Sequence, residues 1–200
     1  GLPIPAQVPL YAPGKGRFGA LFLIGWGCMD AQLQDYLDKV STLPVEEQEE
    51  ILKLLQDLDV ATKREASQTS FLKFVQEMWP AFIHGSHHEI MSDAFEKVCD
   101  GKLKRLIINM PPRHPKSEFA SYLLPAWFLG RFPEKKVIQT AHTAELAVGF
   151  GRKVRNLVGD DDFKEVFKDV SLRSDSKAAG RWNTNKGGEY FAIGVGGAVT

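Results

Sequence analysis

The chain has 200 residues, of which 44% are hydrophobic, and equal numbers of acidic and basic side chains. A chain of this length and composition can bury one sizeable core, so we expect one globular domain with at most a small appendage. The zero net charge excludes the strongly basic class of nucleic-acid-binding proteins. The charge is nevertheless uneven, because residues 30–60 hold nine acidic and two basic residues, whereas residues 101–136 hold eight basic and two acidic ones.

Residues 1–28 differ in composition from the rest of the chain, with four of the 11 prolines, six of the 18 glycines and an apolar run at residues 18–28. This run is shorter than the roughly 20 residues that span a bilayer, so no membrane association is expected. Basic residues precede it, which makes a signal peptide the alternative. Met29 is followed by Asp30, a plausible helix N-cap. We therefore expect Met29 to be the native initiator and residues 1–28 to be upstream or non-native sequence.

Residues 29–66 have the pattern of an acidic helical hairpin. The first helix begins at Asp30; Thr42 is the predicted N-cap of the second, and Pro44 lies in its first turn. Each helix has an apolar stripe at helical spacing: Leu33, Tyr36, Leu37 and Val40 in the first, and Ile51, Leu54, Leu55 and Leu58 in the second. We expect the hairpin to pack on its own domain, with a partner subunit as the alternative, and residues 63–68 to form a polar link.

Residues 70–100 are again predicted to be helical, with Phe71, Phe74, Val75 and Met78 on one face and Met91, Phe95 and Val98 on another. His87 and His88 are adjacent, but neighbouring side chains diverge on a helix and no third ligand is apparent, so no zinc site is predicted. Cys28 and Cys99 are far apart and have no metal-binding spacing, and both are expected to be reduced.

Residues 105–118 have the order strand, tight loop, helix. A short apolar run over residues 105–110 predicts a buried strand, two prolines end it, and Lys116 and Ser117 begin a helix. In a phosphate-binding loop, backbone N–H groups and the positive end of a helix converge on one anion, a lysine reaches the outer phosphates, and the next hydroxyl holds Mg²⁺.

The match to the pattern G-x-x-x-x-G-K-[ST] is imperfect. Met110 and Pro115 occupy the two glycine positions, and Pro115 has no N–H to donate to a phosphate. The alternative is therefore a buried strand that ends in a proline-rich turn without binding anything.

The residues after the loop predict a parallel sheet with helical crossovers. A helix is expected to about Phe128, kinked or shortened by Pro125. The later predicted elements are a strand at residues 136–141, a helix at 144–158, and a hairpin of residues 181–184 and 189–193. Two charged clusters each have a functional and a structural interpretation. For Arg152, Lys153 and Arg155 these are a surface that faces DNA or a neighbouring subunit, and a solvated helix face. For Asp160, Asp161 and Asp162 they are a metal site, and a helix cap or turn; the second is expected, because consecutive carboxylates do not all converge on one ion without other ligands.

Several separated motifs between residues 71 and 200 closely resemble the ATPase domain of the large terminase subunit of tailed bacteriophages, which carries a deviant loop of the form P-P-R-x-x-K-S. The motifs are Trp79-Pro80, Gly85-Ser86-His87-His88, Met110-Pro111-Pro112-Arg113-His114 with Lys116-Ser117-Glu118, Pro125-Ala126-Trp127, Leu129-Gly130, Gly151 to Arg155, Arg181-Trp182, and Gly194 to Thr200. The resemblance implies an α/β P-loop NTPase fold with a central, mainly parallel sheet over residues 67–200, preceded by the α-helical appendage.

The resemblance also implies the roles of individual residues. Lys116 and Arg113 would be catalytic: Lys116 would bind the β- and γ-phosphates, and Arg113 would act as an arginine finger in cis. Ser117 would hold Mg²⁺. The loop residues Pro112 and His114 would contribute to ATP binding, and Trp79 and His88 would hold the adenine. Glu118 is not expected to be the catalytic base, which the family places beyond residue 200.

The implied function is ATP-driven packaging of double-stranded viral DNA into a procapsid, in the host cytoplasm during virion assembly. The implied partners are DNA, a portal protein, a small terminase subunit and further copies of the chain in a ring. The family's Walker B carboxylates and nuclease domain are expected to lie beyond the given sequence. The alternatives are another P-loop translocase or helicase, and a nucleotide- or DNA-binding fragment without turnover.

Overall fold

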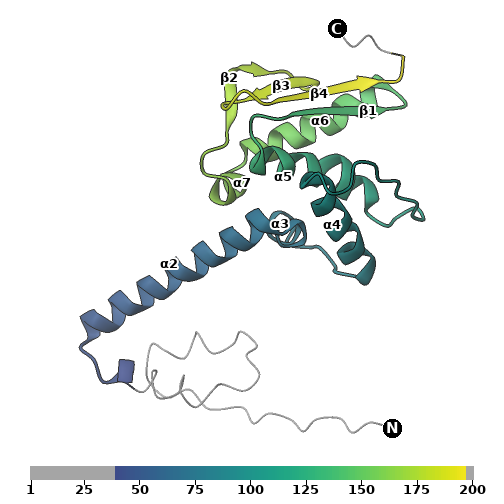
Figure 1. Ribbon diagram of the computed structural model, residues 1–200. Helices are drawn as coiled ribbons and strands as arrows, with labels where there is room; N and C mark the ends of the chain where they lie inside the picture. The colour runs from purple at the N-terminus through teal and green to yellow at the C-terminus, as the bar shows by residue number, and fades with distance from the viewer. Residues whose placement is uncertain (1–38, 197–200) are drawn as a thin grey trace, which may run out of the picture. The chain divides into compact units, whose positions relative to one another are not determined.

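The computed structural model describes residues 39–196, which form an α/β structure with a single four-stranded mixed sheet. Contacts divide the chain into two units, residues 1–54 and 55–200. The elements, labelled as in Figure 1, are α2 (Val45–Thr69), α3 (Phe71–Met78), α4 (Ser86–Cys99), the π-helix η2 (Glu118–Leu123), α5 (Leu124–Arg131), β1 (Lys136–Ala141), α6 (Ala144–Gly159), α7 (Asp161–Val166), β2 (Leu172–Lys177), β3 (Arg181–Thr184) and β4 (Glu189–Gly194).

The described part of the first unit contains a short helical turn and the beginning of α2. Thr42 does not cap α2 as predicted, because its hydroxyl donates to the Lys39 carbonyl at 2.7 Å. The helix begins at Val45, directly after Pro44, and the Gln48 side chain donates to loop carbonyls before it. The predictions for residues 1–28 and for the first helix of the hairpin lie outside the described residues, except for its last two positions.

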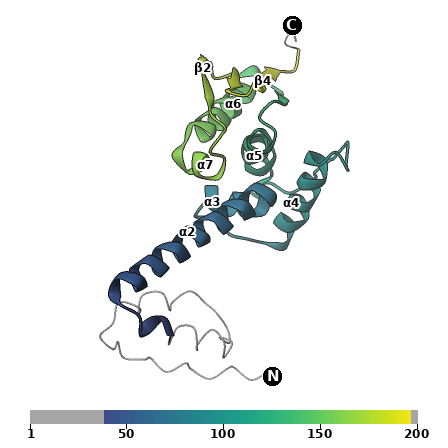
Figure 2. The same cartoon turned by 60° about the vertical axis from the view of Figure 1, so that its left-hand side comes forward.

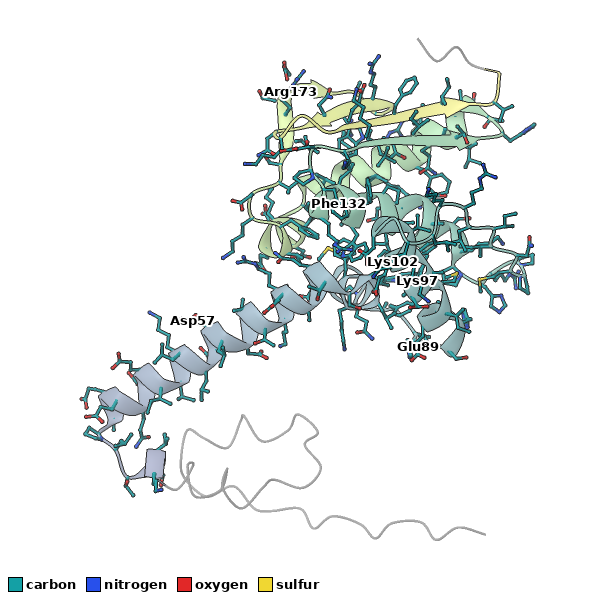
Figure 3. The ribbon with its side chains drawn as sticks, viewed as in Figure 1. Asp57, Glu89, Lys97, Lys102, Phe132 and Arg173 are labelled. Carbon is teal, nitrogen blue, oxygen red and sulfur yellow. The ribbon has the colours of Figure 1, made fainter. Side chains whose placement is uncertain are left out.

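The second unit begins within α2, and the predicted polar link at residues 63–68 is wrong. Those residues are helical, because tertiary contacts hold the end of α2: the indole Nε1 of Trp127 donates to the Ser67 carbonyl at 2.9 Å, and the Gln68 amide donates to the Val166 carbonyl. The predicted apolar stripe of α2 is not covered by described residues, since Leu58 is 63% exposed. Acidic side chains such as Asp57 project from the helix in Figure 3.

The core of the second unit is aromatic and lies between the helices and the sheet. Phe71 has no exposed surface, and its ring contacts those of Phe95, Phe119 and Trp127 at centroid distances of 5.4–5.7 Å. The predicted helices over residues 70–100 are confirmed as α3 and α4. Their apolar faces therefore meet the helix that follows the candidate loop.

The sheet has the strand order β1-β4-β3-β2. Only β1 and β4 pair in parallel, whereas β4 with β3 and β3 with β2 are antiparallel. The predicted strand at residues 136–141, the helix at 144–158 and the hairpin are confirmed, and α6 lies along one face of the sheet in Figures 1 and 2. Within residues 39–196, no helix is both long and apolar enough to cross a membrane.

The predicted buried strand at residues 105–110 is not a strand. No described segment forms a backbone ladder with it, and without a neighbouring strand its outer side chains stay in solvent. Ile107 is 84% exposed, whereas Ile108 and Met110 are partly buried and pack against the core. The segment before the loop is thus an extended chain that packs on the core only through Ile108 and Met110.

The helix after the loop begins at Lys116 as predicted, but it continues past Phe128 to Arg131. Pro125 does not end it. The six residues before α5 form the wider π-helical turn η2, so the regular α-helical hydrogen bonds are already interrupted just before Pro125. The missing N–H of the proline therefore does not end the helix.

Two glycines of α6 provide a matched test of how closely this helix packs on the sheet. A Cβ at Gly151 would lie 2.5 Å from the Ala179 carbonyl oxygen, whereas one at Gly149 would meet nothing within 4 Å. We expect Gly151→Ala to lower the free energy of unfolding by about 1–3 kcal/mol, and Gly149→Ala to raise it by about 0.5–1 kcal/mol because alanine favours the helix. Urea titration of both variants measures this, and equal effects would contradict the packing.

Candidate functional site

Residues 111–117, the 111–117 loop, make a compact turn between the extended segment and η2. Arg113 has a φ of 66°, and it is the non-glycine residue in the described chain with a positive φ. A bulky residue in this region is strained, and such strain is concentrated at functional sites. The left-handed turn is therefore at Arg113 and not at either glycine position of the sequence pattern.

Local hydrogen bonds close the loop. The Lys116 N–H donates to the His114 carbonyl, and the Phe119 N–H donates to the Pro115 carbonyl at 2.9 Å. His114 Nδ1 lies 3.2 Å from the Pro112 carbonyl oxygen, an acceptor, so this nitrogen carries the proton in the assigned tautomer. Despite Pro115, the loop has a defined geometry without any ligand.

The Lys116 ammonium points back into the loop. Its Nζ donates to the Met110 carbonyl at 3.2 Å and to the Pro111 carbonyl at 3.4 Å. These two neutral acceptors hold the half-buried charge over the loop. An anion would be a stronger partner for the ammonium, since charge-assisted hydrogen bonds exceed those to neutral acceptors.

The first helical turn after the loop offers further donors. In the described part of the chain, the N–H groups of Ser117 and Glu118 donate to no backbone carbonyl outside their helix, as is usual for a helix N-terminus. Ser117 is exposed, as are Pro112 and Arg113. The set of an ammonium, helix N–H groups, a hydroxyl and an arginine suits a polyphosphate with Mg²⁺.

Glu118 is directed away from this donor set. Its carboxylate pairs with Lys153 of α6 at 3.0 Å, and the Lys153 ammonium also lies over the rings of Tyr122 and Phe150. Within residues 39–196, no group of three His, Cys, Asp or Glu side chains has a metal-binding arrangement.

Trp79 and His88 are connected to the loop helix through a cluster of rings. Trp79 is half-buried and contacts Phe82 at 5.7 Å. The ring of His88 lies 4.7 Å from that of Phe82 and is stacked 5.0 Å from that of Phe119. His88 is only 4% exposed and His87 is partly buried, whereas His84 is exposed.

The protonation of His88 follows from its hydrogen bond. Nδ1 accepts from the Gly85 N–H at 3.0 Å, so in the assigned tautomer the proton is on Nε2, which is buried without a partner in the described structure. Burial lowers the pKa of His88 below its usual value of 6.5, and His87, His84 and His114 lower it further. The environment of the His88 imidazole in the folded chain therefore favours its neutral form.

This neutral histidine predicts acid sensitivity of the fold. Because the pKa is lower in the folded than in the unfolded chain, the contribution to stability is complete above pH 6.5 and is lost as the pH falls below it. We expect the free energy of unfolding to fall more between pH 7.5 and 5.5 in the wild type than in His88→Phe. The exposed His142→Asn serves as control and should behave like the wild type; identical slopes in all three proteins would contradict the prediction.

The charged clusters of α6 and α7 differ in their relation to the candidate site. In the α6 cluster, Lys153 reaches the helix after the loop through its ion pair with Glu118, whereas Arg155 donates to Asn156 and Arg152 is exposed. Asp160 caps α7, since its carboxylate accepts the Asp162 N–H at 3.2 Å, which confirms the predicted cap.

A hollow of about 440 Å³ lies elsewhere, near the end of α5, where Phe132 is labelled in Figure 3. Its lining includes Arg64, Arg131, Lys168 and Phe167. Arg131 is partly occupied by an ion pair with Asp100 and lies over the Trp127 ring. The 111–117 loop ends where η2 begins, and η2 continues into α5, so the loop and the hollow lie at opposite ends of this helical segment. The hollow and the donor set are therefore separate features.

Three features of the site were not predicted from the sequence: the φ of Arg113, the ion pair of Glu118 with Lys153, and the contact of the His87 ring with that of His114 at 5.4 Å. The last two join residues that are 35 and 27 positions apart, and no local pattern reveals such pairs. The geometry of the 111–117 loop therefore defines the candidate site.

Comparisons of the chain with protein-family models, with curated proteins and with solved structures found no match.

Proposed function

We propose that the 111–117 loop binds the phosphates of Mg-ATP and that the second unit is part of a P-loop ATPase domain of the large-terminase type. One observation carries the proposal: the Lys116 ammonium is held by neutral carbonyls beside the open N–H groups of a helix N-terminus. The sequence motifs shared with terminases support the identity of the motor.

In this proposal, residues of the loop contact different parts of Mg-ATP. Lys116 would exchange its two carbonyl partners for β- and γ-phosphate oxygens, and Arg113 would add a second cation at the turn. The Ser117 hydroxyl would hold Mg²⁺, which neutralises charge on the phosphates when bound. Below them, Trp79 and His88 support the loop helix through Phe82 and Phe119 and are the proposed contacts on the adenine side.

At the level of the whole motor, the proposal is ATP-driven translocation of double-stranded DNA into a procapsid. The basic residues 101–136 would face phosphate, either of the nucleotide or of DNA. A ring of copies, a portal protein and a small terminase subunit are the proposed partners, in the host cytoplasm.

The test is a calorimetric titration of the chain with Mg-ATP, Mg-ADP and AMP. Recognition by the loop uses the phosphates beyond the α-phosphate, so we expect Mg-ATP and Mg-ADP, which carry the β-phosphate, to bind at least about tenfold more tightly than AMP, which lacks both the β- and the γ-phosphate. AMP affinity equal to that of Mg-ATP would contradict phosphate recognition by the loop, and so would the absence of any binding.

A second candidate function is nucleotide binding without turnover. It is favoured by the ion pair between Glu118 and Lys153, which directs the carboxylate next to the loop away from the phosphate donors. Hydrolysis stimulated by duplex DNA would support the motor, whereas stoichiometric binding of Mg-ATP without phosphate release would support the binding function.

A further inference from the structure

The 111–117 loop touches α4 through a pair of histidine rings. His87 is the second residue of α4, His114 is in the middle of the loop, and their rings meet edge to face at 5.4 Å with an interplanar angle of 67°. The hydrogen bonds of the loop in the described structure are all local, from Lys116, His114 and Phe119 to carbonyls at residues 110–115. The ring pair is thus a link between the loop and a distant part of the chain.

His87 is itself firmly supported. Its ring lies 3.8 Å from that of His88, and its Nε2 is buried. His88 in turn is stacked on Phe119, the second residue of η2. A continuous series of rings therefore runs from the helix after the loop, through α4, and back to His114 within the loop.

The neighbours of His87 on its own side of the contact are also imidazole rings. The ring of His88 lies 6.4 Å from that of His84, and His84 pairs with Glu89 at 3.2 Å. The contact of His87 with the loop is therefore one of ring packing.

We propose that His87 is a positioning residue that holds the 111–117 loop against α4 through its ring contact with His114. As an aid to nucleotide binding, the inference rests on the proposed function; as a contact that orders the loop, it does not.

The first experiment needs no nucleotide. Hydrogen exchange at pH 7.5 is followed at the amides of Lys116 and Phe119, which are hydrogen-bonded to loop carbonyls. We expect about 2- to 10-fold faster exchange in His87→Ala, as for the loss of one aromatic pair, and a rate near that of the wild type in His87→Phe, which keeps a ring. The Tyr190 amide in β4 is the internal control. Unchanged loop exchange in His87→Ala would overturn the positioning role.

The second experiment measures the affinity for Mg-ATP at pH 7.5 in the wild type, His87→Ala and His87→Phe. We expect His87→Ala to lose at least about threefold in affinity, because a less ordered loop must be ordered on binding, and His87→Phe to stay near the wild type. An affinity of His87→Ala equal to that of the wild type would overturn the effect of the contact on nucleotide binding. If no variant binds nucleotide, the proposed function fails, and the exchange rates alone decide the positioning role.

Discussion

Replacing Lys116 with alanine is expected to weaken the binding of Mg-ATP on the order of 100-fold, as the loss of charge-assisted hydrogen bonds to two phosphates predicts. The fold should be nearly unaffected. The ammonium bonds only to the Met110 and Pro111 carbonyls in the described structure and is half-buried. We expect the free energy of unfolding to change by less than about 1 kcal/mol, the usual net value of such bonds.

Two further variants separate the position of the charge from its presence. Lys104→Ala removes an exposed cation from the segment before the loop and should leave the affinity for Mg-ATP within about twofold of the wild type. Lys116→Arg keeps the charge, but its planar group does not fit a site shaped for an ammonium, so we expect an intermediate loss. Calorimetry on the three variants and the wild type decides: equal affinities in Lys116→Ala and the wild type would remove the loop from the nucleotide site.

Local patterns predicted the elements whose stability is decided locally. The helical spacing of Phe71, Phe74 and Val75 predicted α3, and the glycine-containing turn at residues 185–188 predicted the hairpin of β3 and β4. These elements need little information from distant residues, because periodicity fixes which face is buried and turn residues fix where the chain reverses.

Two segments whose conformation depends on a distant partner were predicted wrongly. Residues 105–110 have the composition of a strand, but a strand needs a neighbour, and none of the described segments pairs with them. The polar residues 63–68 have the composition of a link, but the Trp127 indole and the Val166 carbonyl hold them in α2. Contacts 60 and 98 residues away decided the conformation of residues 63–68, and the lack of a pairing strand among the described residues decided that of residues 105–110.

The candidate site divides in the same way. The adjacency of Lys116 and Ser117 at the start of a helix was readable from the sequence, because the loop motif is contiguous. Which residue takes the left-handed φ was not, since the motif points to Met110 and Pro115 and the structure uses Arg113. The contact between the loop and α4 could not be predicted from the sequence either, because it joins two histidines from separate segments.

The support beneath the site predicts the largest effect on stability, for Phe71→Ala. The Phe71 ring is fully buried and contacts three aromatic rings, so we expect its loss to cost about 3–5 kcal/mol. For a chain of this size the melting temperature should fall by about 10 °C. The Phe71 N–H keeps its bond to the Glu96 carboxylate at 2.7 Å, so the loss reports packing and not a broken backbone contact.

This variant should also disturb the loop from a distance. Phe119 contacts both Phe71 and His88, so a cavity at residue 71 loosens the ring series that reaches the 111–117 loop. Ile83→Ala is the control, because Ile83 is 86% exposed and should change stability by less than about 0.5 kcal/mol. Thermal and urea unfolding measure the stabilities, and the hydrogen-exchange rate of the Lys116 amide measures how well the loop is ordered. A Phe71→Ala protein as stable as Ile83→Ala would show that this core is not packed as described; a destabilised one with unchanged loop exchange would show that the core does not support the site.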